Sequence, residues 1–389
     1  MSFERLLKIK PLCKYVRRLI EQNPSLVHKF PHYDDNFNFV NPSMHLLLID
    51  VNGCLPYTSL VSNFAMQLTI KSEEIPHPLR VQNSENTQRI LTLGSCNGLM
   101  LQSVKKNLFV WNPSTEGHKL VSPVEFASPS SRPLKCWMRV YGLGFDVNTK
   151  DYKIVLIKYL GEPTSSLRRY KLETKVGIYS LREGSWRIIE NLSCPYLIYQ
   201  RQSCEDLIFN GALHWIGLFA DSTDGHYSKR IVAFDFGVEK FKEIPLSDDY
   251  QWWIERHEFE RLSFGVWREC LCMFRKLDNG WADIIVMKEY GVKESWCELY
   301  TISEESVDWK PRDPFNVPRD GCGMKLVCFT SNDKIVLQLD DQHLFLYDPV
   351  CGVGNKLRIS EGAPLHVLNK NKCYIQPYMP NLQLSLREQ

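Results

Sequence analysis

The residues whose types and spacing could support covalent chemistry lie in one short motif. Gly94-Ser95-Cys96-Asn97-Gly98 has the outline of a nucleophile elbow with a cysteine at its centre. That elbow requires a strand followed by a helix, because the sharp turn between them exposes the nucleophile. Here strand-like residues follow the motif, and Asn97-Gly98 is a strong hairpin signal. We therefore interpret the motif as a hairpin turn.

Glycine and cysteine motifs elsewhere lack the partners that ligand binding requires. Gly142-Leu143-Gly144 and Gly352-Val353-Gly354 have neither the third glycine nor the following helix of a dinucleotide site. Cys270-Leu271-Cys272 places two thiols on one face of a strand, but zinc would need a second pair of ligands at suitable spacing. His257 and Cys297 could meet them only through the tertiary fold. We predict core cysteines, no metal and no cofactor.

Composition excludes several classes of protein. The chain has 389 residues, 44% of them hydrophobic, and a net charge of +2. Its basic and acidic residues are interspersed, so the sequence does not indicate the basic surface that binds DNA or RNA. No run approaches the about 18 apolar residues of a membrane helix, and the first residues lack the apolar core of a signal peptide. We expect thirteen reduced cysteines in a cytoplasmic or nuclear protein.

Two alternating patterns along the chain predict an all-β fold. One is a tight polar turn between apolar runs, as at Asn210-Gly211, and the other is an aromatic strand, a turn and a second strand, as at 178–186. Such pairs, repeated about every 40–60 residues, are typical of a β-propeller. We expect six kelch-like blades of four strands. Five span about 90–124, 138–192, 205–246, 262–302 and 324–359, and the sixth joins strands near 45–70 to strands near 364–377.

The lengths of the connections indicate where a propeller of this sequence would bind. Within each blade the turns between the first and second strands are short, and the connections at the opposite end are long. Long loops that share one face of a rigid scaffold usually carry binding residues. One of them, 247–257, contains Trp252, Trp253 and Arg256 among charged residues, and another contains Arg168 and Arg169. Two readings of the tryptophans stay open: an interaction hot spot, or a Trp that fills the core.

An ordered series of phrases resembles a known family. They are Gly94-Ser95-Cys96-Asn97-Gly98-Leu99, Val110-Trp111-Asn112-Pro113, Tyr141-Gly142-Leu143-Gly144-Phe145-Asp146, Asp151-Tyr152-Lys153-Ile154-Val155, Val176-Gly177-Ile178-Tyr179, Phe209-Asn210-Gly211-Ala212-Leu213-His214-Trp215, and Ala233-Phe234-Asp235. This series, over roughly 90–360, resembles plant F-box proteins with an F-box-associated, kelch-like domain, a broad family that includes the S-locus and immunity-related F-box proteins. The resemblance implies a β-propeller domain, which we place at 37–379, after a helical segment at 1–32.

The N-terminal segment resembles the second half of an F-box. Apolar residues near helical spacing, interrupted by Pro11, predict two short helices over 4–30. By the resemblance, the residues that would contact a Skp-type adaptor are Leu6, Leu7, Cys13, Leu19 and Ile20. The opening Leu-Pro pair and first helix of the motif do not precede them. We expect weaker adaptor binding than for a complete F-box, because each hundred Å² of lost apolar contact costs about 2.5 kcal/mol.

The resemblance implies a non-catalytic function. The chain would be the substrate-recognition subunit of a Skp–cullin–F-box ubiquitin ligase, holding an unknown protein target near the activated ubiquitin on the cullin scaffold. The alternative is a propeller that binds a protein partner without adaptor or ubiquitylation, as a competitor of full-length relatives or the product of a decaying gene. We predict neither nucleic-acid nor membrane partners.

Overall fold

The computed structural model describes the chain from the first predicted strand of the propeller onward, with gaps. The described residues are 45–50, 57–61, 69–75, 90–104, 107–122, 124, 136–161, 173–189, 192, 194–198, 207–220, 227–257, 261–277, 280–307, 324–330, 333–339, 343–359 and 373–378. The predicted helical segment 1–32, with Leu6, Leu7, Cys13, Leu19 and Ile20, lies outside them. So do Arg168, Arg169 and most of the expected long connections.

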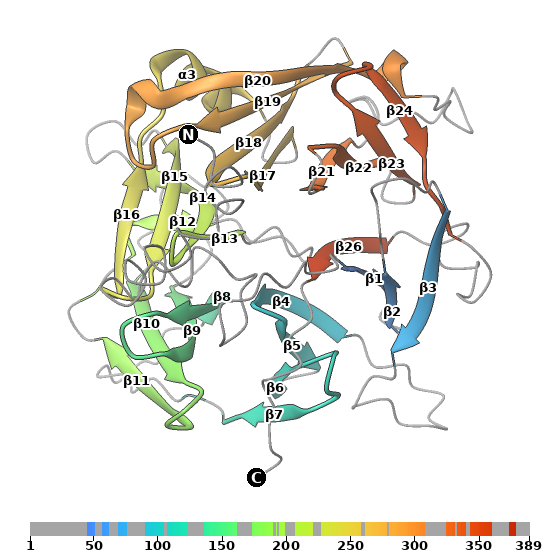
Figure 1. Cartoon of the computed structure of the whole chain (residues 1–389). Coiled ribbons are helices and arrows are strands. Elements are labelled where there is room, and N and C mark those ends of the chain that lie inside the picture. Colours follow the sequence, from blue (N-terminus) through green and yellow to red (C-terminus); the bar gives the residue numbers. More distant parts are fainter. Residues whose placement is uncertain are drawn as a thin grey trace, which may run out of the picture.

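The described residues form six mainly antiparallel sheets arranged in a ring (Figure 1). Five sheets are continuous in sequence, and the sixth combines strands from the two ends of the described chain. Figure 1 shows β4, β17, β21 and β26 nearest the centre, and β7, β20, β24 and β3 at the outside of their sheets. The all-β propeller is therefore confirmed, and its blades follow the predicted boundaries closely. Of the six sheets in the ring, four have the predicted four strands and two have five.

The first two blades have four strands each, in the order of the sequence. Blade 1 contains β4 (Ile90–Cys96), β5 (Leu99–Val104), β6 (Asn107–Trp111) and β7 (His118–Val121). Blade 2 contains β8 (Cys136–Asp146), β9 (Asp151–Leu160), β10 (Glu173–Ser180) and β11 (Ser185–Ile189).

The next two blades are joined by the one α-helix among the described residues. Blade 3 contains β12 (Tyr196–Ile198), β13 (Leu207–Phe209), β14 (Ala212–Ala220), β15 (Tyr227–Asp235) and β16 (Lys240–Ile244). The helix is α3 (Asp248–Arg256). Blade 4 contains β17 (Leu262–Trp267), β18 (Cys270–Lys276), β19 (Trp281–Met287) and β20 (Trp296–Ser303), with 3₁₀ turns η4 (Lys293–Ser295) and η5 (Glu304–Ser306).

The last two blades close the ring. Blade 5 contains β21 (Lys325–Phe329), β22 (Ile335–Leu339), β23 (His343–Asp348) and β24 (Val353–Lys356). Blade 6 contains β1 (His45–Asp50), β2 (Tyr57–Val61), β3 (Thr69–Ile75), β25 (Arg358–Ile359) and β26 (Cys373–Tyr378). In blade 6, β26 pairs with β1 over the whole length of both strands, and β25 adds a short parallel pairing to β3. Because strands from both ends of the described chain pair within this blade, the blade closes the ring of sheets.

The hairpin turns have the backbone geometry that their sequences predict. Asn97 and Gly98 have φ values of 46° and 81°, and Asn210 and Gly211 have 50° and 72°. Two central residues with positive φ define the type I′ turn, whose twist matches that of the flanking strands. Cys96 is the last residue of β4, is buried, and has its pKa raised to about 12 by that burial. A buried thiol of this kind is not a nucleophile.

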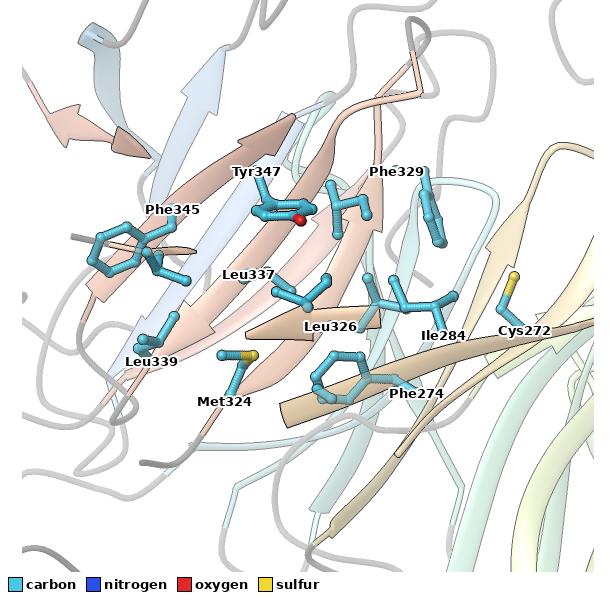
Figure 2. Close-up of a cluster of buried hydrophobic side chains, with 14 of the residues drawn as sticks. Cys272, Phe274, Ile284, Met324, Leu326, Phe329, Leu337, Leu339, Phe345 and Tyr347 are labelled. Atoms are coloured by element: carbon cyan, nitrogen blue, oxygen red, sulfur yellow. The ribbon is translucent and has the colours of Figure 1, made fainter. Parts of the chain in front are cut away.

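Apolar side chains from consecutive blades interlock and form the core. Figure 2 shows this for blades 4 and 5, where Phe274 and Ile284 meet Leu326, Leu337 and Tyr347. Cys272 lies in the same cluster, with its pKa raised by burial, and Cys270 packs against it. The prediction that the two thiols pack in the core is therefore confirmed for Cys272.

Two glycines allow blades 2 and 3 to approach closely. Gly142 and Gly144 lie in β8, where an added Cβ would overlap the side chain of Leu213 at the first position and the ring of Phe236 at the second. Leu213 and Phe236 belong to the apolar cluster between the two blades. The Gly-Leu-Gly motif thus allows close packing of the two blades, because the ring of Phe236 occupies the space that a side chain at Gly144 would need.

We expect Gly144→Ala to lower the free energy of unfolding by about 3 kcal/mol, because the ring of Phe236 has to leave its place in a filled interface. Urea unfolding measures this. The matched control is Gly352→Ala, where no atom lies within 4 Å of the added Cβ. Only the positive φ of 69° disfavours alanine there, and it should lower the free energy of unfolding by about 1 kcal/mol. Equal losses in the two variants would contradict the packing role of Gly144.

Candidate functional site

The segment with the two tryptophans is a helix, which corrects the expectation of a loop. α3 occupies the connection from β16 to β17. Asp248 and Asp249 begin the helix and Arg256 ends it. Negative charge at the N-terminus and positive charge at the C-terminus interact favourably with the helix dipole. Tyr250, Trp253 and Ile254 recur at intervals of three and four residues, which places them on one face. That helical spacing was the signal in the sequence for this helix.

Trp253 belongs to the core. Its side chain is 7% exposed, and Ile254 beside it is fully buried. Both lie in the apolar cluster between blades 3 and 4. The ring of Trp253 stacks on His257 with 4.1 Å between centroids, and the guanidinium of Arg275 lies 5.5 Å from its centroid. Its buried position corrects the view of Trp253 as a contact residue, because little of its surface is available to a partner.

Trp252 has the opposite environment. It is 54% exposed, and the guanidinium of Arg256 lies 4.1 Å above its ring. A cation over an indole face is attracted by the ring quadrupole, so the two side chains orient each other. Tryptophan and arginine are the residue types most enriched in binding hot spots. Trp252 and Arg256 are therefore the predicted target-binding residues that the structure brings together at the surface.

Polar contacts fix α3 to the propeller. The side chain of Gln251 donates to the carbonyl of Lys229 at 2.8 Å, and the ammonium of Lys229 donates to the carbonyl of His257. Arg230 pairs with Glu255 at 3.3 Å. At the other end of the helix, Lys293 pairs with Asp248 at 2.6 Å. Trp252 and Arg256 thus stand on a helix attached to both neighbouring blades, which keeps their positions defined.

A charged pocket of about 350 Å³ lies between blades 2 and 3, where the short turns are found. Its lining includes Asp146, Lys153, Arg187 and Glu239. The ammonium of Lys153 lies 2.6 Å from Asp146 and 2.7 Å from Glu239. Arg187 donates to both oxygens of Glu239, at 2.8 and 2.6 Å. The network joins the two blades, and sequence reasoning missed it because 86 residues separate Lys153 from Glu239.

The network shifts the pKa values of Asp146, Glu239 and Lys153 toward their charged forms. Burial opposes ionisation of Asp146, but hydrogen bonds from Lys153 and Thr149 hold its pKa below the ordinary value. Burial acts on Glu239 in the same way, and Arg187 and Lys153 lower its pKa. For Lys153 burial alone would lower the pKa, whereas Asp146 and Glu239 raise it. Since these groups satisfy one another, the arrangement stabilises the fold and does not resemble a catalytic acid and base.

The described part of the chain contains no cluster suited to metal binding. No group of three or more His, Cys, Asp or Glu side chains there could hold an ion. Within the same residues, no helix is long and apolar enough to cross a membrane. The geometry that is present is that of a rigid ring with an exposed tryptophan and arginine on one connecting helix.

Comparison with known proteins assigns the family. The model of the F-box associated beta propeller domain matches residues 48–382. The chain belongs to this family. The resemblance to plant F-box proteins with an F-box-associated domain is thereby confirmed, while the boundaries 1–32 and 37–379 stay predictions.

Its curated relatives include F-box proteins of Arabidopsis thaliana. The chain is 25% identical to F-box protein CPR1 over 283 residues, which is 69% of this chain and 63% of the relative. It is 29% identical to F-box protein At3g07870 over 286 residues, 67% of this chain and 64% of the relative. With F-box/kelch-repeat protein At3g23880 it shares 30% identity over 54% of this chain and 52% of the relative. The chain thus covers less than two thirds of the length of these relatives.

We expect the two tryptophans to respond differently to truncation. Trp253→Ala should lower the free energy of unfolding by about 3–5 kcal/mol, because it leaves a large cavity between blades 3 and 4. Trp252→Ala should change it by less than about 1 kcal/mol, since an exposed cation–π pair contributes about that much. Thermal and urea unfolding of the two variants check this, and a similar loss in both would contradict the split between core and surface.

We expect the network around Lys153 to make stability depend on acid pH. The pKa values of Asp146 and Glu239 are lowered by folding, so their contribution is present above their unfolded pKa values near 4 and is lost as pH falls. Lys153→Met should cost about 3–5 kcal/mol at pH 7, because it leaves Asp146, 2% exposed, without its cation. The measurement is urea unfolding from pH 7 to 3, in which the difference between the two proteins should shrink as the pH falls. A constant difference would contradict the pairing.

Proposed function

We propose that this protein is the substrate-recognition subunit of a Skp–cullin–F-box ubiquitin ligase and performs no covalent chemistry itself. The observation that carries the proposal is the match of residues 48–382 to the F-box associated beta propeller domain. Relatives that carry this similarity are F-box proteins. In the proposed mechanism the propeller binds a target, the ubiquitin-carrying enzyme is recruited through the cullin, and the reaction is accelerated by proximity.

We assign target binding and adaptor binding to two different parts of the chain. The propeller is a closed ring whose blades pack against each other, so it can present a surface without rearranging. Trp252 and Arg256 are our candidates for target contact, since both lie on α3 and the ring of Trp252 is exposed. Leu6, Leu7, Cys13, Leu19 and Ile20 are our candidates for adaptor contact, by resemblance to the second half of an F-box.

Adaptor binding tests the proposal directly. We expect the 389-residue protein to retain a purified Skp-type adaptor in a pull-down, with an F-box relative as positive control. The charge-introducing variant Leu19→Asp with Ile20→Asp should abolish retention, because an apolar contact surface does not accept unpaired carboxylates. Circular dichroism shows whether each sample is folded.

The opposite result has a definite meaning. A folded protein that does not retain the adaptor would contradict the ligase role of this chain. The alternative, a propeller that binds a protein without ubiquitylation, would then apply. Retention that the double variant leaves unchanged would contradict the assignment of Leu19 and Ile20.

A further inference from the structure

The charged pocket between blades 2 and 3 has walls made of three short turns. They are the β8–β9 turn at 146–151, the β10–β11 turn at 180–185 and the β15–β16 turn at 235–240, and all three lie wholly within the described residues. The pocket volume of about 350 Å³ falls within the range of ligand pockets, roughly 300–1,000 Å³. Because α3 follows the far end of β16, the pocket is a separate surface from Trp252 and Arg256.

The charges that line the pocket do not all belong to the ionic network. The lining has four carboxylates and three cations, an excess of one negative charge. The carboxylates are Asp146, Asp151, Glu183 and Glu239, and the cations are Lys153, Arg182 and Arg187. The network pairs Lys153 and Arg187 with two of the carboxylates. Asp151, Glu183 and Arg182 remain outside these ion pairs.

Asp151 is a buried carboxylate whose hydrogen bonds come from neutral groups. Its side chain belongs to a residue that is only 4% exposed. One oxygen accepts from the hydroxyl of Ser180, and the other accepts from the backbone amide of Arg182 at 3.0 Å. Buried carboxylates are usually paired with a cation. Since each carboxylate oxygen can accept a second hydrogen bond, Asp151 can also accept from a cationic group placed in the pocket.

Glu183 and Arg182 stand at the exposed rim of the pocket. The backbone amide of Glu183 donates to the hydroxyl of Ser180 at 3.0 Å, which fixes the turn. Its carboxylate makes no hydrogen bond or ion pair with the rest of the described chain. The guanidinium of Arg182 donates to the carbonyl of Thr149 at 2.9 Å, so it is held against the β8–β9 turn. The carboxylate of Glu183 is therefore available to a ligand.

We propose that this pocket binds an organic cation, a guanidinium or alkylammonium group, which Asp151 and Glu183 accept. The excess of negative charge favours a cation over an anion. A metal ion is disfavoured, because no group of three or more His, Cys, Asp or Glu side chains in the described residues could hold one. Val238, 62% exposed, lies in the β15–β16 turn beside the pocket and can contact the alkyl chain that carries the cation. The inference is independent of the proposed ligase role.

Binding of a pair of matched peptides tests the charge of the ligand. The probe is a rhodamine-labelled Gly-Gly-Arg-Gly-Gly amide, titrated with the full chain and followed by fluorescence anisotropy. The matched peptide carries citrulline in place of arginine, which keeps the shape of the side chain and removes its charge. We expect the arginine peptide to bind at least about tenfold more tightly, because hydrogen bonds between charged groups are the stronger ones.

Variants of the pocket test its two acceptors. Glu183→Gln should weaken binding of the arginine peptide about fivefold and leave the melting temperature unchanged, because the side chain is exposed. Asp151→Asn should weaken binding at least as much. The matched control is Glu116→Gln, the same change at an exposed position of the equivalent β6–β7 turn in blade 1, and it should change the affinity less than about twofold.

Removal of the cation at the rim should have the opposite effect. Arg182→Met should strengthen binding of the arginine peptide about threefold, because it removes a like charge from the pocket. A purely structural role of the lining would not produce tighter binding. Weaker binding of the arginine peptide by a folded Arg182→Met protein would contradict the proposal.

Two other results would overturn the proposal. One is equal affinity for the arginine and citrulline peptides, or equal affinity of the Glu183→Gln and unaltered proteins, with circular dichroism showing that each sample is folded. The other is tighter binding of a matched glutamate peptide, lost in Arg182→Met, which would show a site for anions. Because Glu183 is exposed, its variant decides the outcome even where Asp151→Asn fails to fold.

Competition identifies the source of the cation. Agmatine, a free guanidinium amine, would displace the labelled peptide as readily as unlabelled peptide does if the ligand is a small amine. A requirement for at least about tenfold more agmatine would identify a basic side chain of a bound protein. Both results support a cation site. Adaptor retention by Glu183→Gln should equal that of the unaltered protein, so loss of peptide binding refutes only the pocket, and absence of adaptor retention refutes only the ligase role.

Discussion

The contact between neighbouring sheets is the interaction on which the rest of this structure depends. Each of four apolar clusters combines side chains of two consecutive blades, and the residues of one blade face the clusters on both of its sides. A single four-stranded sheet of this kind would leave its apolar faces in water. The blades are therefore stable only as a ring, and the pairing of β26 with β1 is the step that closes it.

Close approach of the sheets explains several unusual residues. Gly142 and Gly144 lack side chains where Leu213 and Phe236 of blade 3 occupy the space. Between blades 3 and 4, α3 contributes Trp253 and Ile254 to the same kind of interface. Near the short turns, where water reaches the gap between blades 2 and 3, the contact is continued by the ions of Asp146, Lys153 and Glu239. Apolar packing and a satisfied ionic network thus join the blades at different depths.

A rigid ring leaves its outer groups available for binding. Trp252 and Arg256 contribute little to the core, and their positions are set by a helix that both adjacent blades hold. Tryptophan and arginine are residue types suited to recognition, and their place on the helix agrees with the proposal that the propeller binds a protein.

The sequence by itself determined the elements whose causes are local. Asn97-Gly98 and Asn210-Gly211 predict type I′ turns because only residues that tolerate positive φ form them, and the spacing of such turns located the blades. The helical period of Tyr250, Trp253 and Ile254 was also present in the sequence, although the polar residues around it led us to expect a loop. Tertiary structure alone decided which tryptophan is buried and which residues meet Lys153. These outcomes depend on strand register and on contacts between distant segments, which local sequence patterns do not specify.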